Sequence, residues 1–120
     1  MKYFVLDRER VPRPALLMEW GEFYDNPGAR RVGETLIFPQ REASPGKQMQ
    51  KRPLSDPAKA RYRVSTYFIG MSGKIFETTW IDPMSEEEYI RGVKHTASWS
   101  AAEKAHAAMV KRAWMAASDD

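Results

Sequence analysis

The fold of this chain is decided by the stretch Arg63-Val-Ser-Thr-Tyr-Phe-Ile-Gly-Met-Ser-Gly-Lys-Ile-Phe-Glu-Thr-Thr-Trp-Ile-Asp82. Its two halves are rich in β-branched and aromatic residues, which favour strands. Gly70 and Gly73 lie between the halves, and two strand-like runs joined by a short link with glycine are typical of a β-hairpin. The stretch therefore predicts paired strands over 61–70 and 74–81.

Segments on both sides of this hairpin predict an α+β fold. Strands are expected over 2–7 and 31–38, and over 89–96, where the residue pattern alternates. Helices are expected near 14–26, beginning at Pro14, and near 99–116. The apolar face of the first helix would consist of Leu16, Leu17, Trp20, Phe23 and Tyr24. The order β-α-β-insert-β-β-β-α predicts a single antiparallel sheet of four to five strands, with the two helices covering one face.

Length and composition limit the alternatives. The 120 residues fit one domain over 1–120, and the proline-rich segment 39–60 is an insert or a mobile loop. The chain contains no cysteine, which excludes disulfides, zinc–thiolate sites and cysteine nucleophiles. The apolar run at the start is too short for a signal peptide, so we expect a cytoplasmic protein with no membrane partner.

Positive charge is concentrated in one segment. The net charge is +3, but seven basic residues against Glu42 and Asp56 give the segment 40–63 a charge of +5. These basic residues are Arg41, Lys47, Lys51, Arg52, Lys59, Arg61 and Arg63. They are candidates for binding the phosphates of a nucleic acid or of a nucleotide. The alternative is a solvated loop without a partner.

Two histidines and two glutamates are the candidates for catalysis. His106 lies in the apolar stripe of the last predicted helix, where a core histidine is the expected role. Glu77, in a strand, could form an acid–base site with His106 or face Glu34 from another strand. The alternative is that both carboxylates face solvent or pair with arginines across the sheet. Neither His106 nor His95 has nearby residues at metal-ligand spacing, so we expect no metal and no cofactor.

Trp114 and Met115 lie side by side near the end of the last predicted helix. An exposed tryptophan next to methionine is a common anchor of protein interfaces. We expect either a homodimer through this helix end or packing within the chain.

Several short motifs follow one another in an order that suggests a family. They are Tyr3-Phe4-Val5-Leu6-Asp7, Glu19-Trp20, Arg30-Arg31-Val32, Val64-Ser65-Thr66-Tyr67-Phe68-Ile69-Gly70, Phe76-Glu77-Thr78, Ser98-Trp99 and Ala105-His106. This set resembles a group of small uncharacterised proteins found in bacteriophages, prophages and actinobacterial or proteobacterial genomes. Relatives often have a Leu-Asp-His motif and a longer loop after the Val-Ser-Thr strand, and this chain lacks both. The resemblance implies a phage or mobile-element context and identifies no ligand.

These observations favour a non-enzymatic binding protein that acts on a host system. An anti-defence protein of the anti-CRISPR kind, which blocks a host nuclease complex or sequesters a small nucleotide, is the concrete form of this hypothesis. One alternative is a nucleic-acid-binding accessory protein that uses the basic segment. Another is a small hydrolase or transferase built around Glu77 and His106.

Overall fold

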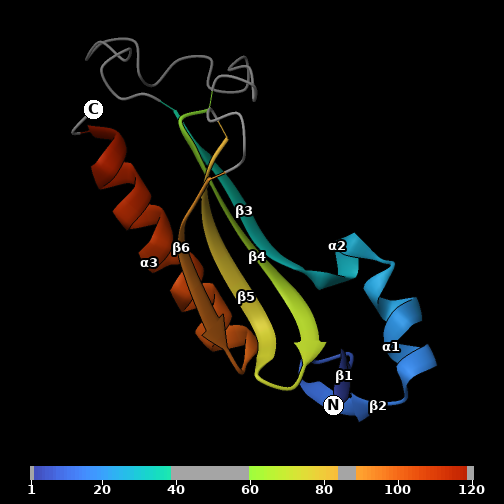
Figure 1. Cartoon of the computed structure of the whole chain (residues 1–120). Helices are drawn as coiled ribbons and strands as arrows, with labels where there is room; N and C mark the ends of the chain where they lie inside the picture. Colours follow the sequence, from blue (N-terminus) through green and yellow to red (C-terminus); the bar gives the residue numbers. More distant parts are fainter. Residues whose placement is uncertain (1, 39–59, 84–88, 119–120) are drawn as a thin grey trace.

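The computed structural model describes residues 2–38, 60–83 and 89–118, which form an α+β fold on an antiparallel sheet (Figure 1). This confirms the predicted fold class. The elements are β1 (Tyr3–Leu6), β2 (Pro12–Ala15), α1 (Leu17–Tyr24), α2 (Pro27–Arg30), β3 (Arg31–Ile37), β4 (Tyr62–Met71), β5 (Lys74–Asp82), β6 (Tyr89–Thr96) and α3 (Trp99–Ser118).

The predicted hairpin forms the centre of the sheet. β4 pairs with β5 in antiparallel register, with Val64 opposite Trp80 and Phe68 opposite Phe76. Gly70 and Gly73 have φ angles of 76° and 80°, a left-handed conformation that glycine adopts readily. A Cβ atom at Gly70 would lie 2.5 Å from the carbonyl oxygen of Phe4, so this glycine also lets β1 approach the hairpin.

β4 is the strand on which the sheet is assembled. The strand order is β2-β1-β4-β5-β6, and β3 also pairs with β4. β3 pairs along the first part of β4, whereas β1 pairs with it at Met71, so β3 and β1 occupy the same edge of β4. The sheet has six strands, more than the four to five expected, because of β2.

The N-terminal region differs from the prediction in two places. Pro12–Ala15 forms the outer strand β2, with Pro12 opposite Leu6, so the prediction that a helix begins at Pro14 is wrong. Proline lacks a backbone N–H and is tolerated at the edge of a sheet. The Asp7 carboxylate accepts hydrogen bonds from the amides of Glu9 and Val11, at 2.8 and 2.9 Å, and so holds the turn between β1 and β2.

The predicted first helix is present as the shorter α1, and the additional short helix α2 follows it beyond the predicted end at 26. The Asn26 side chain accepts a hydrogen bond from the Ala29 amide at 3.3 Å and caps the short α2. Phe23 packs edge-on against Phe68, with the ring centroids 5.6 Å apart. Leu16, in contrast, is 80% exposed and Leu17 is also exposed, so their predicted place in an apolar face is wrong.

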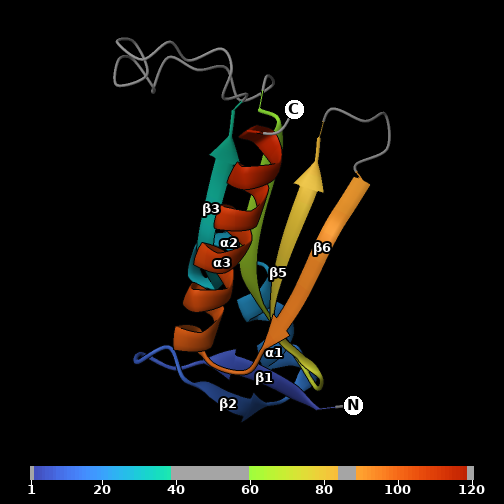
Figure 2. The ribbon, with the colours of Figure 1, turned by 90° about the vertical axis from the view of Figure 1, so that its left-hand side faces the viewer.

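The main core lies between the sheet and α3 (Figure 2). Ile37, Tyr62, Val64 and Trp80 of the sheet pack against Met109, Ala113 and Ala117 of α3. A second cluster consists of Phe68, Phe76 and Ala102. Burying one large apolar side chain contributes about 1.5–3 kcal/mol to stability. Among the described helices, α3 makes the contacts to β3, β4, β5 and β6 on this face, whereas α1 and α2 lie toward the opposite side of the sheet and reach the second cluster only through Phe23 (Figure 1).

The last helix begins where the sequence indicated. The Ser98 side chain accepts a hydrogen bond from the Ala101 amide at 3.1 Å and caps α3. Within the described residues, no helix is both long enough and apolar enough to cross a membrane. Residues 39–59 lie outside the described part of the chain, and so does most of the predicted insert; Ala60, at its end, is fully buried.

Candidate functional site

His106 belongs to a layer of polar side chains between the two apolar clusters. Its Nε2 atom lies 2.9 Å from Thr35 Oγ1, and its Nδ1 atom lies 2.8 Å from Thr66 Oγ1. Thr66 Oγ1 is also hydrogen-bonded to Thr78 Oγ1 at 2.8 Å. Gly33 packs against the His106 ring: a Cβ atom at this position would lie only 3.2 Å from Nε2. We call His106, Thr35, Thr66 and Thr78 the polar layer.

This environment makes His106 a structural residue. Burial lowers its pKa below the usual 6.5 because a charged imidazolium would lose hydration. Both ring nitrogens already have hydroxyl partners, which leaves neither nitrogen for a substrate in this arrangement. The sequence predicted a core position with apolar neighbours; the apolar clusters are present on both sides, but the direct partners are threonines.

The opposite face of the sheet is exposed over much of its area. We call it the open face: the side of β3, β4, β5 and β6 that points away from α3. Strand register places on it Glu34, Leu36, Arg63, Ser65, Tyr67, Glu77, Thr79, Ile81, Ile90, Val93 and His95. Among the described helices, α1 and α2 approach β4 from this side: Trp20 Nε1 of α1 donates to the Ile69 carbonyl oxygen and Arg30 Nε of α2 to the Phe68 carbonyl oxygen, both at 2.9 Å.

Polar side chains occupy the part of the open face nearest α2. The Tyr67 hydroxyl donates to Glu34 Oε2 at 3.1 Å, and Arg31 Nε donates to the Tyr67 hydroxyl at 3.3 Å. The hydrogen bond with Tyr67 raises the pKa of Arg31. On the far side of β4, His95 Nε2 lies 2.9 Å from Glu77 Oε2. The polar groups of this area therefore satisfy one another.

The hypothesis of a joint Glu77–His106 site is not supported by this geometry. Glu77 lies on the open face and bonds to His95, whereas His106 lies on the face covered by α3. Glu34 and Glu77 do share the open face, but β4 separates them and each has a different partner. Within the described ranges, no three His, Asp or Glu side chains are grouped so that they could hold a metal ion.

The remainder of the open face combines exposed aliphatic side chains with Arg63 and Thr79. Ile90 and Val93 of β6 are 53% and 49% exposed, and Leu36 of β3 is also exposed. Val93 lies opposite Thr79, in the middle of the face. Because Ile90 and Val93 leave about half of their surface exposed, contact with a partner would remove further apolar area from water.

Most of the predicted basic site lies outside the described residues. Arg41, Lys47, Lys51, Arg52 and Lys59 fall within 39–59. Arg61 Nη1 forms an ion pair with Asp82 Oδ2 at 2.8 Å, and Arg63 lies on the open face opposite Leu36 and Ile81. Arg61 therefore has a structural partner, and phosphate binding by the other residues remains a prediction.

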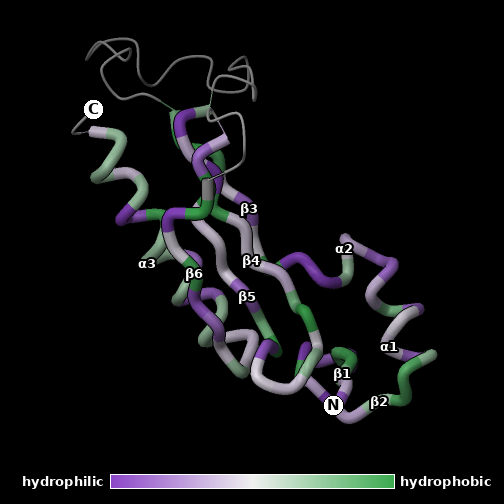
Figure 3. The backbone as a smooth tube through the Cα atoms, viewed as in Figure 1, coloured by the Kyte–Doolittle hydropathy of each residue, from purple (hydrophilic) through white to green (hydrophobic). Residues whose placement is uncertain are grey.

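Two further exposed apolar areas lie away from the open face. Trp114 and Met115 of α3 are 52% and 58% exposed, so both side chains are accessible to a partner. The homodimer through this helix end remains a prediction. Leu16, before α1, and Leu17 and Met18, in its first turn, are also exposed. Figure 3 shows a hydrophobic stretch in green between the labels of β2 and α1.

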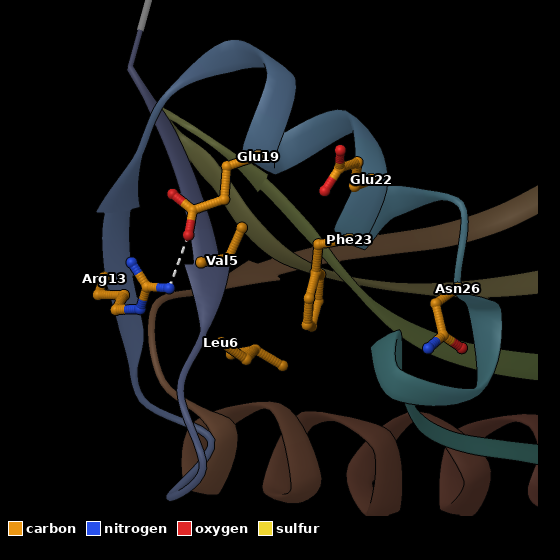
Figure 4. A pocket seen from close by; sticks show the side chains of 7 residues that line it. All are labelled: Val5, Leu6, Arg13, Glu19, Glu22, Phe23 and Asn26. Carbon is orange, nitrogen blue, oxygen red and sulfur yellow. Dashed lines mark hydrogen bonds and ion pairs between the residues drawn. The ribbon is translucent and has the colours of Figure 1, made fainter.

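A cavity of about 320 Å³ lies between the N-terminal hairpin and α1 (Figure 4). Val5, Leu6 and Phe23 form its apolar part, whereas Arg13, Glu19, Glu22 and Asn26 form its polar part. Arg13 Nη2 donates to Glu19 Oε2 at 2.7 Å across this polar part. The ion pair connects β2 to α1, and we therefore interpret the cavity as part of the packing between them.

The sequence did contain signals for residues that the prediction missed. Phe76, Thr78 and Trp80 alternate with Glu77, and a strand places such neighbours on opposite faces. The apolar pair Phe76 and Trp80 therefore already indicated that Glu77 points away from the core. Tyr67 alternates in the same way with Thr66 and Phe68. No sequence signal connects His106 to Thr35, which is 71 positions away.

Comparisons of this chain with protein-family models, with curated proteins and with solved structures found no match.

Proposed function

We propose that this chain is a non-enzymatic binding protein that acts on a host protein through the open face. The observation that carries the proposal is the pair of exposed aliphatic side chains Ile90 and Val93 on β6, beside polar groups that are already hydrogen-bonded. Leu36 of β3 is exposed on the same face, beyond Ile81 and Arg63. Interfaces commonly combine an apolar centre with a surrounding of paired polar groups. The resemblance to phage and prophage proteins supports a mobile-element origin and, as the concrete form, inhibition of a host defence complex.

The experiment begins with affinity capture from bacterial lysate by the tagged full-length chain, with quantitative mass spectrometry. The test variant Thr79→Arg places a long cation in the middle of the open face. The control is Lys104→Glu, which changes an exposed residue of α3 on the other side of the molecule. We expect a host protein that is retained by the natural chain and by the control but lost with Thr79→Arg. If Thr79→Arg unfolds the chain, Leu36→Lys replaces it.

The captured protein is then tested for its role. Cells that carry a phage-defence system express either the natural chain or the Thr79→Arg variant, and plaques are counted after phage challenge. The proposal predicts more plaques with the natural chain and no increase with the variant. Equal capture by all variants would refute the open face as the binding surface, and unchanged plaque numbers would refute the defence hypothesis.

A further inference from the structure

β6 is an edge strand whose outer side has no neighbour among the described elements (Figure 2). Along any strand the backbone N–H and C=O groups point alternately to the two sides. The groups of β6 that point away from β5 therefore remain without a strand partner in the described part of the chain. Such an edge is a template for an additional strand from another molecule.

The charge along this edge has one sign. From Ile90 to Thr96, β6 contains Arg91, Lys94 and His95 and no acidic residue. Arg91 Nη1 donates to the neutral Tyr62 hydroxyl at 2.7 Å, and its guanidinium lies 5.0 Å from the centre of the Trp80 ring. Arg112 of α3 approaches the same ring at 5.7 Å. Within residues 2–38, 60–83 and 89–118, neither arginine nor Lys94 forms an ion pair with a carboxylate.

The two faces of β6 differ in character. Lys94 lies opposite Thr78, on the side of the sheet that faces α3, and the two arginines also lie on this side. Ile90 and Val93 are exposed on the open face. The register between β5 and β6 shifts at Arg91, so the regular alternation of β6 runs from Gly92 to Thr96. A strand added there would place alternate side chains beside Lys94 on one face and beside Val93 on the other, with Arg91 and Ile90 at its end.

We propose that the outer edge of β6 binds an extended acidic segment of a partner protein as an additional strand. Acidic side chains of this segment lie toward Arg91, Lys94 and Arg112, and the side chains between them are apolar and lie toward Ile90 and Val93. This inference rests on the proposed function, because it states which chemistry of a protein partner the chain recognises.

Two other occupants fit the edge less well. A second copy of β6 would place Arg91 and Lys94 beside the same cations of its partner, and like charges opposite one another destabilise a strand pair. A nucleic acid would use the cations but would leave Ile90, Val93 and the backbone edge without contacts. An alternating acidic and apolar peptide uses all three features.

The direct test uses a fluorescent peptide in which Glu alternates with Val, measured by anisotropy with the full-length chain. Two N-methylated forms carry the methyl groups on alternate amides, so that each form blocks a different side of the peptide. Strand addition needs only the side that faces β6. We therefore expect one form to bind like the parent and the other to lose binding. In ¹⁵N NMR spectra, the amide signals of 90–96 should shift most.

Charge variants provide the matched comparison. Lys94→Glu reverses an exposed charge on β6, whereas Lys104→Glu makes the same change on the outer side of α3. Lys94→Glu removes an attractive charge contact with the peptide and replaces it by a repulsive one, so we expect binding to weaken by about tenfold. Lys104→Glu should weaken binding by less than about twofold, because Lys104 lies away from the proposed site. A peptide with Lys in place of Glu should not bind.

Several results would overturn the inference. Equal binding of the two N-methylated forms would show that the backbone edge is not used. Tighter binding of single-stranded oligothymidine than of the acidic peptide would assign the edge to nucleic acid. If the peptide does not bind but the Thr79→Arg variant no longer captures the host protein, only the strand-addition proposal is refuted. If the peptide binds but the Thr79→Arg variant captures the host protein as well as the natural chain does, the proposal that the open face binds the host protein is refuted instead.

Discussion

Replacement of Gly70 by alanine should destabilise the protein far more than the same replacement at Gly73. Both glycines have φ angles near 80°, at 76° and 80°. A left-handed conformation costs a residue with a Cβ atom roughly 1–2 kcal/mol. Alanine also reduces the entropy of the unfolded chain, which offsets about 0.4–1 kcal/mol of this cost at each position. These two contributions are common to both variants.

The surroundings of the two glycines differ. No atom lies within 4 Å of a Cβ at Gly73, but at Gly70 it would lie 2.5 Å from the Phe4 carbonyl oxygen and 2.9 Å from Trp20 Nε1. Alanine at Gly70 must therefore displace β1 and disturb the 2.9 Å hydrogen bond from Trp20 to the Ile69 carbonyl oxygen. Overpacking of this kind costs about 1–3 kcal/mol, and a lost hydrogen bond about 1 kcal/mol more.

We therefore expect a loss of about 1 kcal/mol for Gly73→Ala and roughly 3–5 kcal/mol for Gly70→Ala. Urea unfolding followed by far-UV circular dichroism measures both, because the free energy of unfolding falls linearly with denaturant. Because both variants pay the cost of the left-handed conformation, the difference between their losses measures the steric effect at Gly70. Losses that agree within about 0.5 kcal/mol would refute the close approach of β1 to the hairpin.

Three further predictions concern titration, assembly and the basic segment. Because burial lowers the pKa of His106 in the folded chain, the unfolded chain binds more protons as the pH falls through 6.5. The free energy of unfolding should thus decrease from pH 7.5 to 5.5, and the decrease should be smaller in His106→Gln; equal decreases would contradict the assignment. Joint replacement of Trp114 and Met115 by alanine should leave stability within about 0.5 kcal/mol, since both are exposed, and should convert a dimer to a monomer in analytical ultracentrifugation; a natural chain that stays monomeric at high concentration would refute the interface. Alanine at Lys51 and Arg52 should reduce the salt dependence of duplex DNA binding by about 0.9 per residue in log affinity against log salt; absence of binding at low salt would end the nucleic-acid hypothesis.

Local patterns in the sequence predicted the elements that they specify by themselves. The hairpin at Gly70 and Gly73, the alternation in β6 and the helix after Ser98 were all recognisable, because each depends on neighbouring residues. The prediction missed β2 because prolines at 12 and 14 are typical of the end of a strand or the first turn of a helix. Only its position at the sheet edge makes a proline strand acceptable.

The candidate site was harder to predict because it depends on contacts between distant residues. Arg31 and Tyr67 meet across 36 positions, and Glu77 and His95 across 18. Strand register decides these contacts, and one residue of slip would move Glu77 to the core side. The alternation around Glu77 could have established its face, whereas its partner could not be inferred without the order of the strands.

The polar layer also fixes where α3 lies along its own axis. Besides Met109, the buried residues that the helix contributes to the two apolar clusters are small, Ala102, Ala113 and Ala117, and such small side chains set the position of a helix only weakly. A shift by one helical turn, about 5.4 Å, would remove His106 from Thr35 and Thr66 together. Each buried polar group left without a partner costs about 1–3 kcal/mol. A single imidazole thus adds a specific alignment to the packing of a long, alanine-rich helix, as one buried polar residue does in a coiled coil.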